Sequence, residues 1–327
     1  MRNVNGRGRF RPTDWIPEYA VPEFPRDVAV DDFDQDGDPD LIIVCAEFDG
    51  FSMPDVLLLN DGTGHMTIGP LTLWDASSAV DTDDIDGDSY PDIYVASTFN
   101  CEDHCPPDED SLLHNALPRP FEFLPPPPVP EPESSSDVIL ADFTGNGVAD
   151  ILVASVSPRG VHLFVNDGTG NFSEASETNL PHDSTSLTPQ RFDAGDIDGD
   201  GDLDVVGGVS EPSTLNQLWI NDGAGLFSAV PDAFPANEWN LNLALFDADG
   251  DSDLDLLDVG EKDLLYLNDG NGSFSQGGSL PPRVGGWVAD IAAGDVDGDG
   301  DMDLLLGVHG YDRLWINDGS GSFVQAN

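Results

Sequence analysis

Short apolar runs recur along the chain, and polar segments rich in glycine and aspartate separate them. Continuous apolar runs occupy Leu41–Val44, Ile93–Ala96 and Ile151–Ala154. Apolar runs of this length between turn signals are typical of strands that are buried on both faces. A short alternating run comes before them, as at Asp27–Val30, and each unit continues with a further apolar run, as at Gln217–Ile220. The pattern predicts many short strands and no long helix.

The strand pattern belongs to an internal repeat that covers the chain. An acidic loop marks each repeat, and successive loops begin 48 to 58 residues apart. Five repeats also carry an Asn-Asp-Gly-x-Gly turn, and the second repeat has His114-Asn115-Ala116 in its place. The acidic loops begin at Asp32, Asp84, Asp142, Asp196, Asp247 and Asp295, and the turns begin at Asn60, Asn166, Asn221, Asn268 and Asn317.

Each repeat is expected to form four antiparallel strands, because the Asn-Asp-Gly-x-Gly turn supplies the positive-φ positions of a hairpin. A unit of this size buries its faces only against its neighbours. Radial stacking of four-stranded sheets gives a β-propeller. The sequence therefore predicts an all-β fold, a single β-propeller domain over residues 1–327 with six complete blades. We place the blades at about 26–73, 77–130, 136–179, 189–234, 240–283 and 287–327.

The start of the chain aligns with the end of a repeat. Asn5–Phe10 matches Asp167–Phe172, which contains the turn and the first residue of a last strand. We interpret residues 1–10 as the remnant outer strand of another blade. This leaves two alternatives open, namely a six-bladed propeller with an extra strand and a propeller cut from a seven-bladed parent.

The acidic loops have the ligand pattern of a metal site. Carboxylates recur at positions 1, 3, 5 and 9, counted from the first aspartate, and glycine falls at position 4, position 6 or both. Two carboxylates 4 Å apart repel each other by about 4 kcal/mol at an effective dielectric near 20. A hard divalent cation relieves this repulsion, and flexible all-oxygen coordination favours Ca²⁺ over Mg²⁺. The predicted ligands in five loops are Asp32, Asp34, Asp36, Asp40, Asp84, Asp86, Asp88, Asp92, Asp196, Asp198, Asp200, Asp204, Asp247, Asp249, Asp251, Asp255, Asp295, Asp297, Asp299 and Asp303.

The third loop departs from this pattern. It keeps Asp142 and Asp150 but has Thr144 and Asn146 at positions 3 and 5. Two formal charges attract a divalent cation less than four do, so we expect Asp142, Asn146 and Asp150 to bind Ca²⁺ more weakly or not at all. The chain is therefore predicted to hold about five or six Ca²⁺ ions.

The net charge of the chain excludes some classes of function. The chain has 63 acidic and 11 basic residues and a formal net charge of −52. Nucleic-acid binding needs a basic footprint, so this class is excluded, and docking on anionic membranes is disfavoured. With 39% hydrophobic residues, the chain has enough apolar material for a buried core. Its apolar stretches are too short to span a membrane, which predicts no membrane insertion.

The compartment follows from the expected metal affinity. Calcium sites of extracellular modules have dissociation constants of about 10⁻⁴–10⁻³ M. Such sites fill only where Ca²⁺ is millimolar, as it is outside cells. We therefore expect a structural metal in an extracellular or cell-surface protein, although Met1–Trp15 shows no apolar signal segment.

The acidic loops between strands, together with the Asn-Asp-Gly-x-Gly-x-Phe hairpins, resemble FG-GAP/VCBS repeats. The resemblance extends from Asn5 to Phe323 and is weakest at the third loop and at the second repeat. It implies an integrin-α-like, calcium-binding propeller of the kind also found in many bacterial surface proteins. It further implies a role in adhesion or ligand binding, and it fixes fold and metal better than it fixes the ligand.

A partner is expected on the face opposite the calcium loops, where loop length and composition vary. This face is expected to carry Glu47–Pro54 and Asn100–Asp110, and a protein or glycan is the expected ligand. The aromatic residues of the inter-blade segments either contact this ligand or fill gaps between blades. These residues are Trp15, Tyr19, Trp74, Trp239 and Trp287.

An enzyme is the alternative function. The six histidines are scattered, and the chain contains no nucleophile elbow and no zinc motif. We therefore expect a binding module, with a carbohydrate-active enzyme (polysaccharide lyase or hydrolase), or the glycan-binding propeller domain of such an enzyme, as the alternative.

A few residues carry separate expectations. Trp219 and Trp315 fall in strands and are predicted to be core residues. Cys45 lies in an apolar run, which predicts a buried free thiol. Cys101 and Cys105 are close enough in sequence to form a bridge within one loop if the compartment is oxidising.

Overall fold

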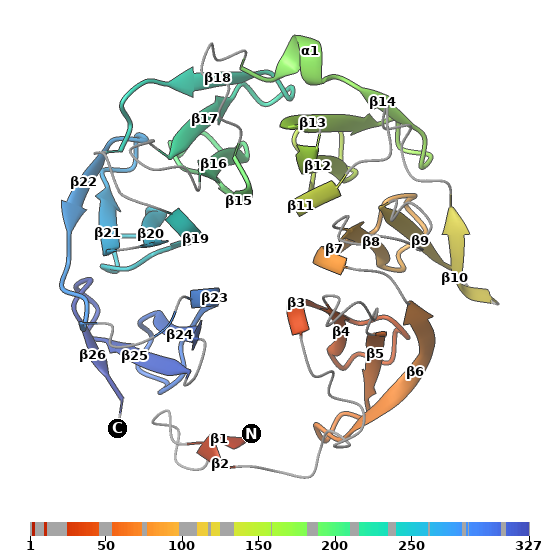
Figure 1. Ribbon diagram of the computed structural model, residues 1–327, viewed down its shortest axis with the longest axis horizontal. Helices are drawn as coiled ribbons and strands as arrows, with labels where there is room; N and C mark the ends of the chain where they lie inside the picture. The colour runs from red at the N-terminus through yellow and green to blue at the C-terminus, as the bar shows by residue number, and fades with distance from the viewer. Residues whose placement is uncertain are drawn as a thin grey trace. The chain divides into compact units, whose positions relative to one another are not determined.

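The computed structural model describes most of the chain and contains almost only β-structure (Figure 1). The described residues are 2–3, 10–11, 25–45, 54–73, 77–97, 110–116, 119–124, 134–157, 159–181, 189–209, 216–234, 240–260, 262–282, 286, 288–308 and 312–326. They fall into two compact units, one of residues 14–180 and one of residues 1–13 and 181–327.

The unit of residues 14–180 contains three sheets, each of four antiparallel strands in sequence order. We call these sheets blades 1 to 3. Blade 1 is β3 (Pro25–Asp31), β4 (Asp40–Cys45), β5 (Asp55–Asn60) and β6 (Met66–Leu73). Blade 2 is β7 (Ser77–Asp83), β8 (Asp92–Ser97), β9 (Ser111–Ala116) and β10 (Arg119–Leu124). Blade 3 is β11 (Ser134–Ala141), β12 (Asp150–Ser157), β13 (Arg159–Asn166) and β14 (Phe172–Glu174), and the one-turn helix α1 (Ser176–Asn179) follows it.

The other unit has three sheets of the same design, blades 4 to 6. Blade 4 is β15 (Arg191–Gly195), β16 (Asp204–Gly208), β17 (Gln217–Asn221) and β18 (Phe227–Val230). Blade 5 is β19 (Asn240–Phe246), β20 (Asp255–Gly260), β21 (Asp263–Asn268) and β22 (Phe274–Gly277). Blade 6 is β23 (Val288–Gly294), β24 (Asp303–Val308), β25 (Arg313–Asn317) and β26 (Phe323–Gln325), and β1 (Arg2–Asn3) pairs with β2 (Phe10–Arg11) in a separate two-stranded sheet.

The six four-stranded antiparallel blades confirm the predicted fold class, an all-β propeller fold. Within each unit the first strand of one blade packs against the first strand of the next, β3 on β7 and β7 on β11, then β15 on β19 and β19 on β23. Among the described residues no helix is long and apolar enough to cross a membrane.

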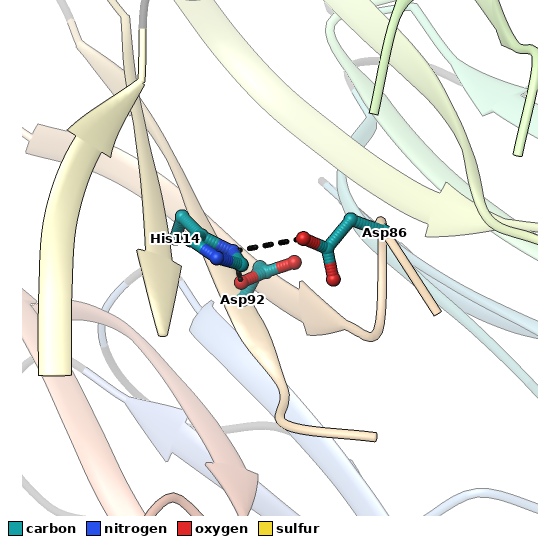
Figure 2. A group of neighbouring side chains, drawn as sticks. All are labelled: Asp86, Asp92 and His114. Carbon is teal, nitrogen blue, oxygen red and sulfur yellow. Dashed lines mark hydrogen bonds and ion pairs between the residues drawn. The ribbon is translucent and has the colours of Figure 1, made fainter. Parts of the chain in front are cut away.

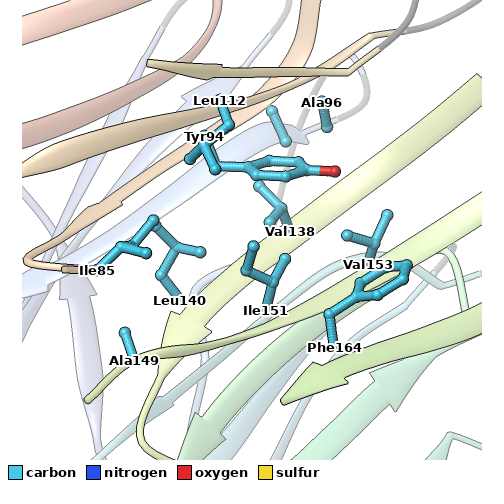
Figure 3. Close-up of a cluster of buried hydrophobic side chains, with 11 residues drawn as sticks. Ile85, Tyr94, Ala96, Leu112, Val138, Leu140, Ala149, Ile151, Val153 and Phe164 are labelled. Atoms are coloured by element: carbon cyan, nitrogen blue, oxygen red, sulfur yellow. The ribbon is translucent and has the colours of Figure 1, made fainter. Parts of the chain in front are cut away.

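The core lies between neighbouring blades. One cluster joins Tyr94 and Leu112 of blade 2 to Val138, Ile151 and Phe164 of blade 3 (Figure 3). Similar clusters lie between blades 1 and 2, 4 and 5, and 5 and 6. The predicted runs Ile93–Ala96 in β8 and Ile151–Ala154 in β12 are buried throughout, whereas Leu41 and Ile43 of the run Leu41–Val44 in β4 are half-buried. A single blade has no such core of its own, so its stability depends on its neighbours.

The separate expectations for core residues are also confirmed. Trp219 and Trp315 are 5% and 1% exposed. Cys45 is buried and free, and burial raises the pKa of its thiol to about 12. Cys101 and Cys105 lie outside the described residues, as do Trp15, Tyr19, Trp74, Trp239 and Trp287.

Carboxylates tie the first strands of neighbouring blades together. Asp81 on β7 accepts the backbone N–H of Leu140 on β11 at 2.8 Å, and Asp193 on β15 accepts that of Leu245 on β19 at 2.7 Å. Burial raises the pKa of both carboxyl groups to about 6. These inter-blade bonds were not predicted from the sequence.

Candidate metal sites in the acidic loops

Each acidic loop joins the first and second strands of a blade, and its first aspartate holds the loop closed. In loop 4, Asp196 accepts the backbone N–H of Gly199 at 2.9 Å and that of Gly201 at 3.2 Å. Both glycines have positive φ angles, 78° and 96°. Positions 4 and 6 therefore require the left-handed region, and where glycine is missing the residues Gln35, Ser89 and Ser252 adopt it.

This loop shape brings carboxylates together as predicted. In loops 1, 2 and 5 the aspartates at positions 1, 3 and 5 each place one carboxylate oxygen within 4.8 Å of the others. In loop 4 the group consists of positions 1, 3 and 9. The groups are Asp32, Asp34 and Asp36; Asp84, Asp86 and Asp88; Asp247, Asp249 and Asp251; and Asp196, Asp198 and Asp204.

The aspartate at position 9 has a role that the sequence did not predict. Asp204 is fully buried, and its two oxygens accept the backbone N–H groups of Ile197 at 3.0 Å and Asn221 at 2.9 Å. Burial raises its pKa to about 6. Asp40, Asp92, Asp255 and Asp303 accept the corresponding two N–H groups. The position-9 carboxylate thus fixes the acidic loop to the third strand, and its oxygens keep lone pairs for a cation.

The carboxylate at position 3 is incompletely compensated. Burial, and then the neighbouring loop carboxylates, raises the pKa of Asp198, Asp249 and Asp297. One oxygen of Asp249 and one of Asp297 are buried and have no hydrogen-bond partner. A buried anionic oxygen without a donor costs free energy unless a cation pairs with it. The all-oxygen donor set and these two orphaned oxygens fit a hard cation such as Ca²⁺.

Loop 3 is held in shape by its aspartate and asparagine side chains, although the buried hydroxyl of Thr144 has no hydrogen-bond partner. Asp142 accepts the backbone N–H groups of Asn146 at 3.0 Å and Gly147 at 2.7 Å. The side chain of Asn146 donates to the backbone oxygen of Asn166 at 3.0 Å and accepts from the N–H of Val148 at 3.0 Å. Asp150 accepts the backbone N–H of Asn166, as its counterparts do on the third strand, and that of Thr144 at position 3, where its counterparts accept from position 2. The loop therefore keeps its shape with fewer charges to neutralise.

In each of four blades, an asparagine side chain donates a hydrogen bond to the acidic loop of the preceding blade. Its side-chain Nδ2 donates to the backbone oxygen of loop position 2, over 2.7 to 2.9 Å. All four asparagines are at most 6% exposed. We call this contact the asparagine latch. The pairs are Asn115 with Phe33, Asn166 with Ile85, Asn268 with Ile197 and Asn317 with Ala248.

The expected partner-binding loops are described only at their ends. Of Glu47–Pro54 the structure describes Pro54, and of Asn100–Asp110 it describes Asp110. Asp110 is buried and accepts hydrogen bonds from the Tyr94 hydroxyl at 2.9 Å and the Ser135 hydroxyl at 2.7 Å. Asp110 therefore joins blade 2 to blade 3 from the inside.

The chain is similar to three solved structures, one of them with a TM-score above 0.5. A lectin of Agrocybe aegerita that recognises non-reducing terminal N-acetylglucosamine is 18% identical, with a TM-score of 0.62 over 91% of this chain and 78% of the lectin. The Photorhabdus luminescens Tc holotoxin pore is 18% identical, with a TM-score of 0.39 over 88% of this chain and 15% of that one. The Vibrio cholerae biofilm matrix protein Bap1 is 16% identical, with a TM-score of 0.40 over 97% of this chain and 41% of Bap1. Curated protein sequences yield no match to this chain.

A sequence profile identifies the repeats. The FG-GAP-like repeat matches five times. Four matches begin at the first aspartate of an acidic loop, and the fifth begins within β20. The matched residues are 32–95, 84–153, 142–207, 196–257 and 259–306, which cover most of the chain. The chain belongs to the FG-GAP-like repeat family.

Proposed function

We propose that this protein is a calcium-stabilised β-propeller that acts outside the cell or at the cell surface as a ligand-binding or adhesion module. The proposal includes one propeller domain over residues 1–327. The observation that carries the calcium assignment is the pair of buried, unpartnered oxygens of Asp249 and Asp297 inside clusters of like charge. The ligands are the 23 loop residues named from the sequence, with loop 3 as the weakest site.

Calcium acts as a structural ion in this proposal. It supplies positive charge where the loop carboxylates converge, and the loops supply oxygen ligands only. A site with a dissociation constant of about 10⁻⁴–10⁻³ M adds roughly 0.4–1.4 kcal/mol of stability at 1 mM Ca²⁺. Five such sites therefore contribute several kcal/mol, a large share of the stability of an ordinary domain.

The ligand is proposed to bind on the face opposite the acidic loops. The loops and the asparagine-led hairpins share one end of each blade, because strand direction alternates within the sheet. The other end carries the segments that differ most between repeats, and variable loops on a rigid scaffold are where binding sites concentrate. The shared fold of a lectin that recognises N-acetylglucosamine supports a glycan as one ligand to test, and a protein ligand is the other.

Thermal unfolding against free Ca²⁺ tests the metal. We expect the wild-type chain to melt higher in 5 mM Ca²⁺ than in EDTA. Asp198→Ala removes one loop ligand and should reduce this difference by about one site's share, roughly 1.1–2.3 kcal/mol at 5 mM Ca²⁺. Asp312→Ala is the matched control, because Asp312 is exposed and lies outside the loops. Identical melting in EDTA and Ca²⁺ would refute the calcium assignment.

A glycan array that includes terminal N-acetylglucosamine tests the ligand, with the same glycans incubated and analysed for cleavage. Calcium-dependent binding without products supports a lectin-like module. Released products would instead identify a carbohydrate-active enzyme. Absence of both would direct the search to protein ligands.

A further inference from the structure

Blade 2 differs from the other blades at one position of its third strand. His114 on β9 immediately precedes the latch residue Asn115. The residue before the corresponding asparagine is aliphatic in every other blade. These residues are Leu59, Val165, Ile220, Leu267 and Ile316. An imidazole therefore replaces a hydrocarbon side chain beside a single acidic loop.

The imidazole lies against two carboxylates of that loop (Figure 2). His114 Nδ1 is 3.0 Å from Asp92 Oδ1 and 3.4 Å from Asp86 Oδ2. The side chains of His114 and Asp92 are 18% and 2% exposed, and that of Asp86 is 27% exposed. The cluster is thus largely shielded from water and open on the side of Asp86.

The supporting contacts hold these ligand atoms in place. Asp92 also accepts the backbone N–H groups of Asn115 at 2.8 Å and Ile85 at 3.2 Å. The register between β8 and β9 pairs Ile93 with Leu113, which puts Asp92 opposite His114. Outer hydrogen bonds that orient a carboxylate in this way are typical of metal ligands.

We propose that His114, Asp86 and Asp92 form a site for a first-row transition ion, with Zn²⁺ as the ion to test. Imidazole nitrogen suits Zn²⁺ and its neighbours in the series, whereas Ca²⁺ takes oxygen ligands. Zinc–nitrogen and zinc–oxygen bonds of about 2.0–2.2 Å in a tetrahedron put ligand atoms roughly 3.3 Å apart. The observed separations of 3.0 and 3.4 Å match that spacing.

This site goes beyond the proposed calcium role. It uses Asp86 and Asp92, which are also proposed calcium ligands of loop 2, so the transition ion takes the place of Ca²⁺ in that loop and leaves the other loops unchanged. The other blades present only carboxylate and carbonyl oxygens beside an aliphatic side chain. Blade 2 presents one nitrogen and two carboxylates, the mixed donor set that gives transition ions their advantage. Blade 2 is therefore selective for a different class of cation from the other five.

Titration of the full chain with Zn²⁺ in 2 mM Ca²⁺ tests the site by calorimetry, and Co²⁺ absorption in the visible range reports nitrogen ligation. His114→Leu is the test variant, because leucine occupies this position in blades 1 and 5. His162→Leu is the matched control, since His162 also lies on a third strand and its Nδ1 lies 3.0 Å from a carboxylate outside the acidic loops, that of Glu174.

We expect one Zn²⁺ equivalent in wild type and in His162→Leu, and at least a tenfold weaker affinity in His114→Leu, with loss of the Co²⁺ bands. Equal Zn²⁺ affinity in wild type and His114→Leu would overturn the site and leave His114 as a hydrogen-bond partner of Asp92. Equal weakening by both leucine variants would also overturn it. Melting of His114→Leu in Ca²⁺ and EDTA reports separately on calcium, so the two proposals fail independently.

Discussion

The asparagine latch of blade 6 offers a direct measure of how strongly neighbouring blades are joined. Asn317 Nδ2 donates to Ala248 O of blade 5 at 2.8 Å and to Met302 O of its own blade at 3.1 Å. Its side-chain oxygen accepts the N–H of Gly319 at 3.3 Å, and the residue is 3% exposed. Asn317→Ala removes all three hydrogen bonds.

The loss of stability in Asn317→Ala depends on whether the former partners of Asn317 keep other hydrogen bonds. Ala248 O keeps a hydrogen bond from the N–H of Gly321 at 2.9 Å, so it is not left unpaired. Each lost bond then contributes its net value of about 0.5–1.5 kcal/mol, and the weak 3.3 Å bond contributes least. We expect Asn317→Ala to lower the free energy of unfolding by about 2 kcal/mol.

Asn60→Ala is the control. Asn60 begins the same kind of hairpin, but the described hydrogen bond of its Nδ2 goes to Pro39 O, within its own blade, at 3.0 Å. Asn60 is also more exposed than Asn317. Its replacement also removes the hydrogen bonds that its side-chain oxygen accepts from Gly62 at 3.3 Å and Gly64 at 3.0 Å. These bonds lie near the surface, where solvent replaces part of what is lost, so we expect a smaller cost of about 1 kcal/mol.

Thermal and urea unfolding, followed by tryptophan fluorescence, measures both variants. Trp315 lies on the same strand as Asn317 and is 1% exposed, so its emission reports on blade 6. At about 2.1 cal/mol/K per residue, a loss of 2 kcal/mol lowers the melting temperature by about 3 °C if all 327 residues unfold together. The shift is about 6 °C if the compact unit of residues 1–13 and 181–327 unfolds separately. Equal shifts for Asn317→Ala and Asn60→Ala would refute a stabilising role for the latch.

Two further predictions concern buried titratable groups. Burial raises the pKa of Asp193 from 3.8 to about 6, so the folded chain binds this proton more tightly than the unfolded chain. Its contribution to stability is therefore greatest below pH 4 and falls as pH rises to 6. Between these pH values, the free energy of unfolding of wild type minus that of Asp193→Asn should decline by at most about 3 kcal/mol. A pH-independent difference would contradict this reasoning. Cys45, with a thiol pKa of about 12, should resist iodoacetamide at pH 8 in the folded chain and react once the chain unfolds in urea. Peptide mass spectrometry measures the labelling of this residue, and labelling of Cys45 in the folded chain would contradict its burial.

The sequence was sufficient for the strands and for the position of the acidic loops. Both follow from local patterns, namely continuous apolar runs for β8 and β12 and the alternation of aspartate with glycine in each loop. The left-handed φ angles at Gln35, Ser89 and Ser252 show that position, more than residue type, defines the loop.

Contacts between distant parts of the chain were beyond such reasoning. Asp81 and Leu140 are 59 residues apart, and their hydrogen bond forms only because two blades stack. The register of β8 against β9 brings His114 to Asp92 across a long insertion. The irregular His114-Asn115-Ala116 segment was visible in the sequence, and alignment of Asn115 with the other hairpin asparagines would have placed His114 beside the acidic loop.

The asparagine latch determines what an exchange of repeats would break and what it would restore. Each latch joins residues about a repeat and a half apart, and successive latches overlap, as Phe33–Asn115 overlaps Ile85–Asn166. If a recombination crossover falls within these spans, at least one latch asparagine and its carbonyl acceptor therefore come from different parent sequences. The acceptor is a main-chain carbonyl and the donor is always asparagine, so a blade copied from elsewhere in the gene restores the same bond. This contact alone therefore sets no barrier to exchanging one blade for another, and it leaves the neighbouring position, where blade 2 has His114, free to vary.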